Sequence, residues 1–240
     1  MSSVLIIIPT YNEKENIAAI LDAVLSLSDD YSILVVDDGS PDGTANIVKQ
    51  LKADIYGDRL HIIEREGKLG LGTAYIAGFR YGIQDSFDYI MEMDADFSHN
   101  PKDISRLLAG FTSDKVGMVV GSRYVKGGGF RNWSKYRLML SYGASIYTRL
   151  ITQMPVKDPT AGFVVYRADV LRQMNLDKIS FIGYAFQIEM KYYCHRLGYK
   201  IAEVPIVFVD RELGTSKMNS SIITEAIKGV IKMRFKDYSK

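Results

Sequence analysis

Two carboxylates one residue apart, Asp94 and Asp96, directly follow the apolar run Tyr89–Met93. If the chain turns after the first of them, both side chains converge and offer hard oxygen ligands, which Mg²⁺ and Mn²⁺ prefer. Such an ion bridges the phosphates of a substrate. Ser98 is a candidate third ligand, directly or through water, whereas His99 is predicted to be structural. Two other interpretations stay open: a phosphatase-type nucleophile, and solvated loop charges.

A second acidic segment, Asp37-Asp38-Gly39-Ser40, follows the apolar run Ile33–Val36. A carboxylate in this place can accept hydrogen bonds from a ribose hydroxyl or a base edge, and Asp38 is the candidate. The alternative is helix capping, because Ser40 and Asp42 stand just before a predicted helix.

The glycine-rich stretch 67–72 contains Lys68. It matches neither the G-x-G-x-x-G dinucleotide pattern nor the phosphate-binding loop of ATPases, so neither class of protein is indicated. Lys68 is nevertheless expected to meet a phosphate at the start of the following helix, where backbone N–H groups favour anions.

Basic residues are concentrated in the second half of the chain. No acidic residue occurs between Arg123 and Arg149, and most charges after Glu225 are lysines and arginines. A segment of one sign among mixed neighbours indicates an anionic partner, the alternative being a solvated basic face. Arginine binds phosphate oxygens in a bidentate fork. The candidates for phosphate binding are Arg123, Arg137, Arg211 and Lys217.

Short β-branched runs alternate with helix-length segments through the first half. The predicted strands are Val4–Ile8, Ile33–Val36, Leu60–Ile63, Tyr89–Met93 and Val116–Val120. The predicted helices are Glu13–Ser26, Gly43–Ala53, Gly72–Ile83 and Lys102–Gly110. This alternation predicts parallel β-α-β units in a sheet covered on both faces. Ligands of such sheets bind beyond the carboxyl ends of the strands, where both acidic segments fall.

The second half begins with a Gly127-Gly128-Gly129 loop and is less regular. We expect strands at Val164–Tyr166 and Ile201–Val209. We expect helices at Ser134–Thr152, Tyr184–Leu197 and Ser220–Lys236.

The totals are those of an ordinary globular chain. Its 240 residues, 47% of them hydrophobic, fit one large α/β domain, and the net charge of +2 indicates no class of partner. The single cysteine, Cys194, excludes an internal disulfide and a cysteine-based zinc cluster. The start lacks the pattern of a signal peptide, and no apolar run approaches the ~20 residues that cross a bilayer. We therefore do not expect an integral membrane protein.

Taken in order, these motifs resemble the GT-A-type glycosyltransferases of family 2, and among them most closely the polyprenol-monophosphate (dolichol-phosphate) mannosyl synthases. The resemblance runs nearly end to end. Its matching segments are Pro9-Thr10-Tyr11-Asn12-Glu13, Asp38-Gly39-Ser40-Pro41-Asp42-Gly43-Thr44, Lys68-Leu69-Gly70-Leu71-Gly72-Thr73-Ala74-Tyr75, Asp94-Ala95-Asp96, Gly121-Ser122-Arg123-Tyr124, Thr160-Ala161-Gly162-Phe163, Val204-Pro205-Ile206 and Ser216-Lys217.

The resemblance implies one Rossmann-like GT-A domain over residues 1–240, with a nucleotide-sugar half (1–123) and an acceptor and membrane-facing half (124–240). It implies that the nucleotide sugar is held by Pro9, Tyr11, Glu13, Asp38, Lys68, Asp94, Ala95 and Asp96. Mg²⁺ or Mn²⁺ would be held by Asp94, Asp96 and Ser98, although relatives carry another ligand, such as Gln, in the place of Ser98. Phosphates would meet Arg123, Arg137, Arg211 and Lys217, and the catalytic set would be Asp96, Arg123 and Arg137.

The implied reaction is inverting transfer of mannose from GDP-mannose to a polyprenyl (dolichyl) phosphate. An anionic phosphate attacks without a general base, and the loop Thr160–Phe163 contains no acid, although Asp158 stands close by. Three alternatives stay open: UDP-glucose as the donor, a phosphotransfer enzyme that uses Asp94 or Asp38 as nucleophile, and a non-catalytic nucleotide-sugar-binding subunit.

The segments Ser134–Thr152 and Ser220–Lys236 combine apolar faces with lysines and arginines, as interfacial amphipathic helices do. The alternative is that both apolar faces pack on the domain. We expect peripheral contact with the cytoplasmic face of a membrane (the endoplasmic reticulum in a eukaryote), directly or through a membrane-anchoring subunit. We expect no nucleic-acid partner.

Overall fold

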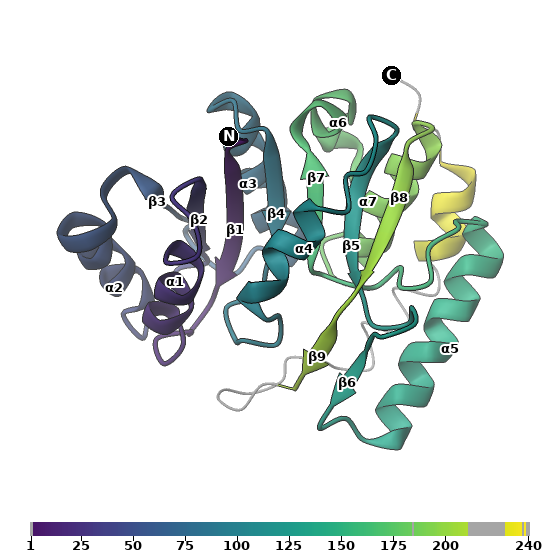
Figure 1. The fold of residues 1–240 in the computed structure, drawn as a ribbon, viewed down its shortest axis with the longest axis horizontal. Coiled ribbons are helices and arrows are strands. Elements are labelled where there is room, and N and C mark those ends of the chain that lie inside the picture. The colour runs from purple at the N-terminus through teal and green to yellow at the C-terminus, as the bar shows by residue number, and fades with distance from the viewer. Residues whose placement is uncertain (1, 184, 211–228, 237, 239–240) are drawn as a thin grey trace.

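A seven-stranded sheet forms the centre of the molecule, in the order β3-β2-β1-β4-β7-β5-β8 (Figure 1). The computed structural model describes residues 2–183, 185–210, 229–236 and 238. The strands are β1 (Val4–Thr10), β2 (Tyr31–Asp37), β3 (Leu60–Glu64), β4 (Tyr89–Glu92), β5 (Val116–Ser122), β7 (Val164–Arg167) and β8 (Lys200–Pro205). Neighbours pair in parallel, except that β7 runs antiparallel to β4 and β5. The expected α/β architecture with a mostly parallel sheet is confirmed.

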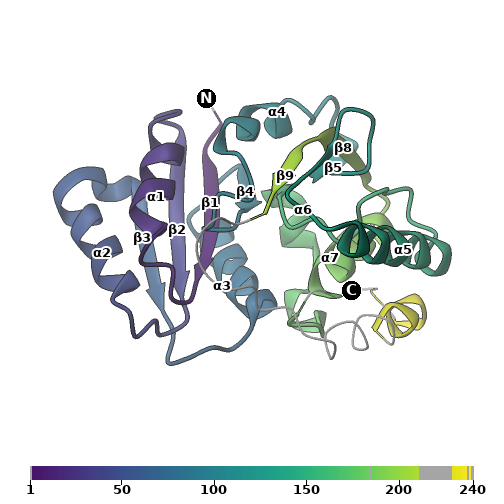
Figure 2. The same cartoon turned by 90° about the horizontal axis from the view of Figure 1, so that it is seen from below.

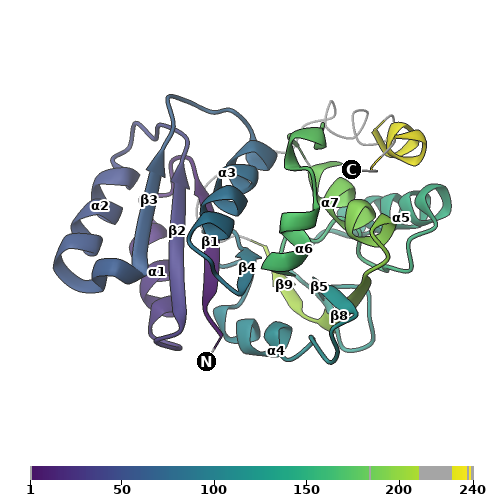
Figure 3. The same cartoon turned by 90° about the horizontal axis from the view of Figure 1, so that it is seen from above.

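Helices cover both faces of this sheet (Figures 2 and 3). They are α1 (Ile17–Leu25), α2 (Thr44–Leu51), α3 (Leu71–Gln84), α4 (Ile104–Leu108), α5 (Lys135–Thr152), α6 (Ala168–Gln173) and α7 (Ala185–Arg196). One core cluster joins α1, α2 and α4 to one face of the sheet, and the other joins α3, α6 and α7 to the opposite face. Residues 229–235 are also helical and pack on the second cluster.

Successive side chains of a strand point to opposite faces of the sheet, so β1 contributes to both core clusters. Leu5 and Ile7 belong to the cluster on the α3 face, whereas Val4, Ile6 and Ile8 belong to the opposite cluster. A strand that is buried on both faces must be largely apolar, as β1 is from Val4 to Pro9.

Glycines let α3 approach the sheet closely. A Cβ atom on Gly78 would lie 2.6 Å from Ile7 Cδ1, and one on Gly82 would lie 2.6 Å from Ile90 Cδ1. Because such distances are far below van der Waals contact, any larger side chain at either position would push the helix away from β1 and β4.

The predicted strand Ile201–Val209 divides between two sheets. Its first part is β8, and its second part is β9 (Val207–Val209), which pairs in parallel with β6 (Gly129–Arg131) in a separate two-stranded sheet. Pro205, which has no N–H to donate, stands at the division. Gly129, the last of the three glycines predicted to form a loop, is the first residue of β6.

The antiparallel direction of β7 decides which loop reaches the carboxyl edge of the parallel strands. Val164, the first residue of β7, pairs with Glu92, the last residue of β4. The preceding loop, residues 158–163, therefore lies at the edge where β4 leads into Asp94 and Asp96.

The helix α5 lies at the outer margin of the molecule, beyond β8 (Figure 1). Ser134 caps it, since its hydroxyl accepts a hydrogen bond from the Arg137 N–H at 3.3 Å. Its buried residues are Ser145, Thr148 and Thr152, all small and polar. Of the predicted helix Ser220–Lys236, residues 220–228 lie outside the described part of the chain. No helix among the described residues is long and apolar enough to cross a bilayer.

Candidate active site

The acidic turn, residues 94–99, follows the end of β4 at the carboxyl edge. The chain bends directly after Asp94, and Phe97 has a φ of 60°. The Asp94 side chain is 40% exposed, whereas Asp96 is buried and accepts a hydrogen bond from the Ser98 N–H at 3.0 Å. The turn that the metal prediction requires is therefore present.

His99 anchors this turn to the core. Its ring stacks on Phe163, with centroids 4.7 Å apart and an interplanar angle of 7°, and its Nδ1 accepts from the Asp94 N–H at 3.4 Å. Burial lowers the pKa of His99 to about 4, so the imidazole is neutral at physiological pH. The geometry agrees with the structural role predicted for His99.

Tyr75, on α3, is fully buried, and its hydroxyl makes no hydrogen bond of ordinary geometry. Burial raises the pKa of Tyr75 well above its usual value, and the charges of Asp94, Glu92 and Asp96 raise it further. The phenol therefore stays protonated beside the acidic turn.

The donor set of the acidic turn fits a hard divalent cation. Asp94 and Asp96 are two carboxylates in this turn, and among the described residues no third His, Cys, Asp or Glu joins such a group. Mg²⁺ is commonly held by one or two carboxylates, with waters and substrate phosphates in the remaining positions. Ser98 is buried beside Asp96, and its role as a third ligand stays a prediction.

The two neighbouring acids at the end of β2 have different surroundings. Asp37 holds its own turn: its carboxylate accepts from the Thr10 hydroxyl at 3.1 Å and from the Ser40 N–H and hydroxyl at 2.8 and 2.6 Å. Asp38 is buried and bound by Arg65, whose Nε donates to Asp38 Oδ1 at 2.6 Å. The N-cap of α2 is Gly43, and no side chain caps it, so Ser40 is not a helix cap: its hydroxyl donates to Asp37 and accepts from the Asn12 N–H. Asp42 Oδ1 accepts from the Thr44 N–H at 3.0 Å, at the start of α2. Ligand binding by Asp38 stays a prediction.

Arg65 is absent from the residues that the sequence singles out. Besides Asp38, it contacts the Thr73 hydroxyl at 2.7 Å and the Gly70 carbonyl at 3.3 Å, both at the start of α3. It therefore ties the end of β2 to the glycine-rich stretch. Its position directly after β3 is the signal that could have found it.

The structure brings Lys68 to the end of β1. Its Nζ lies 5.2 Å from the centroid of the Tyr11 ring, a cation–π distance. Glu13 accepts from the Asn16 side chain at 3.1 Å, and the Asp38 N–H donates to the Thr10 carbonyl at 3.0 Å. Contacts thus join the ends of β1 and β2 and the loop before α3, and Pro9 is the next-to-last residue of β1.

At the opposite side of the acidic turn, Arg123 and Asp158 form a buried ion pair. Arg123 Nε and Nη2 each lie 2.7 Å from a different Asp158 oxygen, and Nη2 also donates to the Thr160 hydroxyl at 2.9 Å. Aromatic rings surround the guanidinium carbon, with centroids 5.4 to 5.7 Å away: Tyr124, Phe130, Trp133 and Phe208.

Asp158 is held as an anion. Burial opposes its ionisation, but the charge and hydrogen bonds of Arg123 outweigh burial, so the pKa of Asp158 lies below its usual value. A carboxylate so bound is a poor proton acceptor. Asp158 therefore binds and orients Arg123 and does not act as the general base that the sequence analysis left open. Direct contact of Arg123 with a substrate stays a prediction.

Arg137 lies beside this ion pair. Its guanidinium carbon stacks 3.9 Å from the Trp133 ring centroid, and Nη1 binds Asp210 at 2.8 Å. The Arg137 side chain is 31% exposed against 9% for Arg123, so Arg137 is the more accessible of the two cations. Arg211 and Lys217, the other predicted phosphate ligands, lie outside the described residues.

Comparison with known proteins shows the family to which this chain belongs. Residues 5–174 match the family described as "Glycosyl transferase family 2". The chain belongs to glycosyl transferase family 2. It is 46% identical to the undecaprenyl-phosphate mannosyltransferase of Micrococcus luteus, over 95% of this chain and 92% of the relative. It is 45% identical to the polyprenol monophosphomannose synthase of Mycolicibacterium smegmatis, over 93% of this chain and 83% of the relative.

Solved structures confirm the GT-A fold of this family 2 chain. Glucosyl-3-phosphoglycerate synthase from Mycobacterium tuberculosis, in complex with phosphoglyceric acid, superposes with a TM-score of 0.72 at 17% identity and covers 99% of this chain and 82% of its own. Its complex with Mn²⁺, uridine diphosphate and glucosyl-3-phosphoglycerate gives a TM-score of 0.71 at 18% identity, with the same coverage of 99% and 82%.

Proposed function

We propose that this chain transfers mannose from GDP-mannose to a polyprenyl phosphate, with inversion at the anomeric carbon. The activities named for two relatives at 45–46% identity over most of the chain support the sugar and the acceptor class. The observation that carries the proposal is the buried pair of Arg123 and Asp158. Because Arg123 binds it, Asp158 is a poor base, and an anionic phosphate acceptor needs no base.

The acidic turn would hold the leaving group. We infer that Asp94 and Asp96 bind Mg²⁺ or Mn²⁺ on the diphosphate of the donor, with Ala95 between them against the nucleotide sugar. A bound divalent ion would supply Lewis-acid stabilisation of the negative charge on the departing diphosphate.

The surface at the ends of β1 and β2 would bind the nucleoside. Pro9, Tyr11, Glu13 and Asp38 are its candidate contacts, and Lys68, 5.2 Å from the Tyr11 ring, is placed for a phosphate. On this proposal Arg65 acts through Asp38, because it holds one oxygen of that carboxylate in place.

Arg65→Met is expected to weaken GDP-mannose binding by about 10-fold or more, since a hydrogen bond to a charged group is worth ~1.5–3 kcal/mol. The affinity is measured by calorimetry in the presence of Mn²⁺. Arg80→Met is the matched control, because Arg80 pairs with Asp177 on the exposed side of α3. Unchanged affinity in Arg65→Met would show that Arg65 does not act on nucleoside binding through Asp38.

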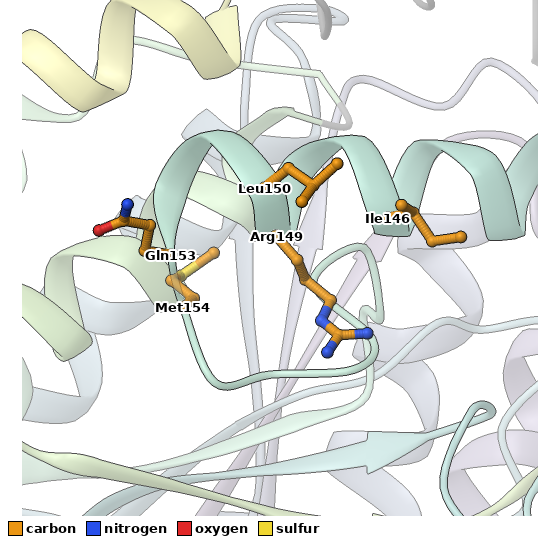
Figure 4. A pocket seen from close by; sticks show the side chains of 5 residues that line it. All are labelled: Ile146, Arg149, Leu150, Gln153 and Met154. Atoms are coloured by element: carbon orange, nitrogen blue, oxygen red, sulfur yellow. The ribbon is translucent and has the colours of Figure 1, made fainter.

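We further propose that α5 contacts a membrane surface where the lipid acceptor is held, at its cytoplasmic face. The helix turns its small hydroxyl residues inward and most of its large apolar residues outward, whereas Tyr147 and Ile151 pack against the core. Figure 4 shows Ile146, Arg149 and Leu150 along its C-terminal half, with Gln153 and Met154 after its end. Exposed large apolar residues on α5 are Tyr136, Leu138, Met139, Leu140, Tyr142, Ile146 and Leu150. Lys135, Arg137 and Arg149 would meet anionic head groups.

The double variant Met139→Ser/Leu150→Ser is expected to lose at least about 10-fold in affinity for anionic phospholipid vesicles, because each apolar side chain contributes ~1.5–3 kcal/mol when it leaves water. These side chains are 64% and 72% exposed in the protein, so its melting temperature should not fall. Vesicle co-sedimentation measures the binding. Ile55→Ser is the control, because Ile55 is 66% exposed on the nucleotide half. Equal loss in the control would argue against a specific surface.

The proposed reaction is tested with purified protein, Mn²⁺, a short polyprenyl phosphate and separately labelled GDP-mannose and UDP-glucose. Transfer of mannose supports the proposal. Transfer from UDP-glucose alone would replace the donor, and phosphate release without a glycolipid product would overturn the transferase assignment for this substrate pair.

A further inference from the structure

A buried polar cluster lies directly beneath the candidate site. It consists of Glu92 at the end of β4, Tyr166 on β7, and Gln187 and Lys191, one turn apart on α7. All four side chains are at most 3% exposed. The helix α7 packs on the β5 and β8 side of the sheet (Figure 3).

Hydrogen bonds join these four side chains into one network. Glu92 accepts from the Tyr166 hydroxyl at 2.7 Å and from the Gln187 side-chain amide. Lys191 Nζ donates to Gln187 Oε1 and to the Gln187 carbonyl, each at 3.2 Å, and to the Ala161 carbonyl at 2.7 Å. All three protons of the ammonium group therefore have acceptors.

The two ends of this hydrogen-bond network, Glu92 and Lys191, reach the two halves of the candidate site. Glu92 stands two residues before Asp94, at the start of the acidic turn. Ala161 follows Thr160, whose hydroxyl accepts from Arg123 Nη2 at 2.9 Å. Gln187 thus touches the segment that leads into the metal ligands, and Lys191 touches the loop that holds Arg123.

Stability alone gives a weak reason for such a cluster. Burial disfavours the charge of Lys191 and lowers its pKa to about 8, even though the carboxylates of Glu92, Asp158 and Glu203 oppose that shift. Apolar residues of similar volume would fill the same space at equal or greater stability. What an apolar core cannot supply is a directed bond to the Ala161 carbonyl.

We propose that Gln187 and Lys191 are positioning residues that fix the loop 158–163 relative to the acidic turn, and so set the distance between the donor and the phosphate acceptor. The proposal rests on the proposed mannose transfer for its catalytic readout. Neither residue touches the substrates. Their effect passes through Ala161 to Thr160 and Arg123 on one side, and through Glu92 to Asp94 on the other.

The test compares Lys191→Met with the double variant Glu92→Gln/Lys191→Met. The single variant leaves Glu92 without its cation, whereas the double variant removes both charges and should regain stability. In both, the Ala161 carbonyl has lost its donor. We expect the KM for polyprenyl phosphate to rise about 10- to 100-fold in both, which is the scale of a misplaced binding group. The affinity for GDP-mannose with Mn²⁺ should stay within about twofold of wild type in the single variant.

Trp133 supplies a readout that needs no turnover. It is the single tryptophan of the chain, and its ring lies 5.7 Å from the Arg123 guanidinium carbon and 3.9 Å from that of Arg137. A short polyprenyl phosphate should change its fluorescence, with a midpoint about 10-fold higher in both variants. Arg196→Met, an exposed position on the same helix, is the control and should match wild type.

Two results would overturn the proposal. In the first, the double variant regains wild-type KM and a wild-type Trp133 midpoint, which would make the cluster a stabilising pair only. In the second, wild-type Trp133 does not respond to polyprenyl phosphate, so that the loop is not at the acceptor. Failure of mannose transfer in the wild type, with the Trp133 response intact and shifted in the variants, would instead refute the donor assignment and leave the positioning role standing.

Discussion

Asp96→Asn is expected to reduce metal-dependent mannose transfer by at least about 1,000-fold, since Lewis-acid stabilisation of the leaving group is worth several kcal/mol. The fold should survive, because the Asn side-chain oxygen can still accept the hydrogen bond that Asp96 takes from the Ser98 N–H at 3.0 Å. Turnover is measured over a Mn²⁺ titration, and folding by thermal melting.

The matched control for this variant is Asp54→Asn, which removes one exposed carboxylate in the short helix Lys52–Tyr56. It should retain wild-type turnover. Wild-type turnover in Asp96→Asn at every Mn²⁺ concentration would remove Asp96 from the metal site. A melting temperature well below that of the control would show that Asp96 acts on the fold instead.

Asp158→Asn is expected to lower the free energy of unfolding by ~3–5 kcal/mol, the usual effect of leaving one partner of a buried ion pair alone. Asp158 is fully buried, and its pair with Arg123 includes two hydrogen bonds of 2.7 Å. Urea unfolding measures the loss. Asp169→Asn breaks the half-exposed pair with Arg167, in which the Asp169 and Arg167 side chains are 43% and 25% exposed, and should cost clearly less than Asp158→Asn, about 1 kcal/mol.

The loss should also depend on pH in a defined direction. Because the pKa of Asp158 is lower in the folded protein than in the unfolded chain, the pair stabilises fully above the ordinary carboxyl pKa of about 4. That contribution disappears as the pH falls through the folded pKa. The difference in stability between wild type and Asp158→Asn should therefore shrink below pH ~4. A difference that stays constant with pH would contradict the ion-pair explanation.

The sequence by itself determined the sheet and the place of the site. Continuous apolar runs such as Val4–Ile8 can satisfy two covered faces only as central strands, so the alternation of strands and helices was readable without tertiary information. The acidic segments after β2 and β4 had to fall at one edge, because the carboxyl ends of parallel strands meet there.

The tertiary structure decided which partner each charged side chain has. Asp37 and Asp38 are neighbours in the sequence but have different partners. Asp37 binds the Ser40 N–H in its own turn, whereas Asp38 binds Arg65, which lies 27 positions away. Arg123 is bound by Asp158 across 35 positions. Such pairs form between separate elements, and no local spacing encodes them.

The orientation of α5 and the direction of β7 were likewise beyond the sequence. A hydrophobic pattern predicts that a helix is amphipathic, but which of its faces is buried depends on the elements that pack against the helix. In α5 the fully buried residues are Ser145, Thr148 and Thr152, and most of the large apolar residues face outward. Only the antiparallel insertion of β7 brings the loop 158–163, and with it the hold on Arg123, to the edge where Asp94 and Asp96 lie.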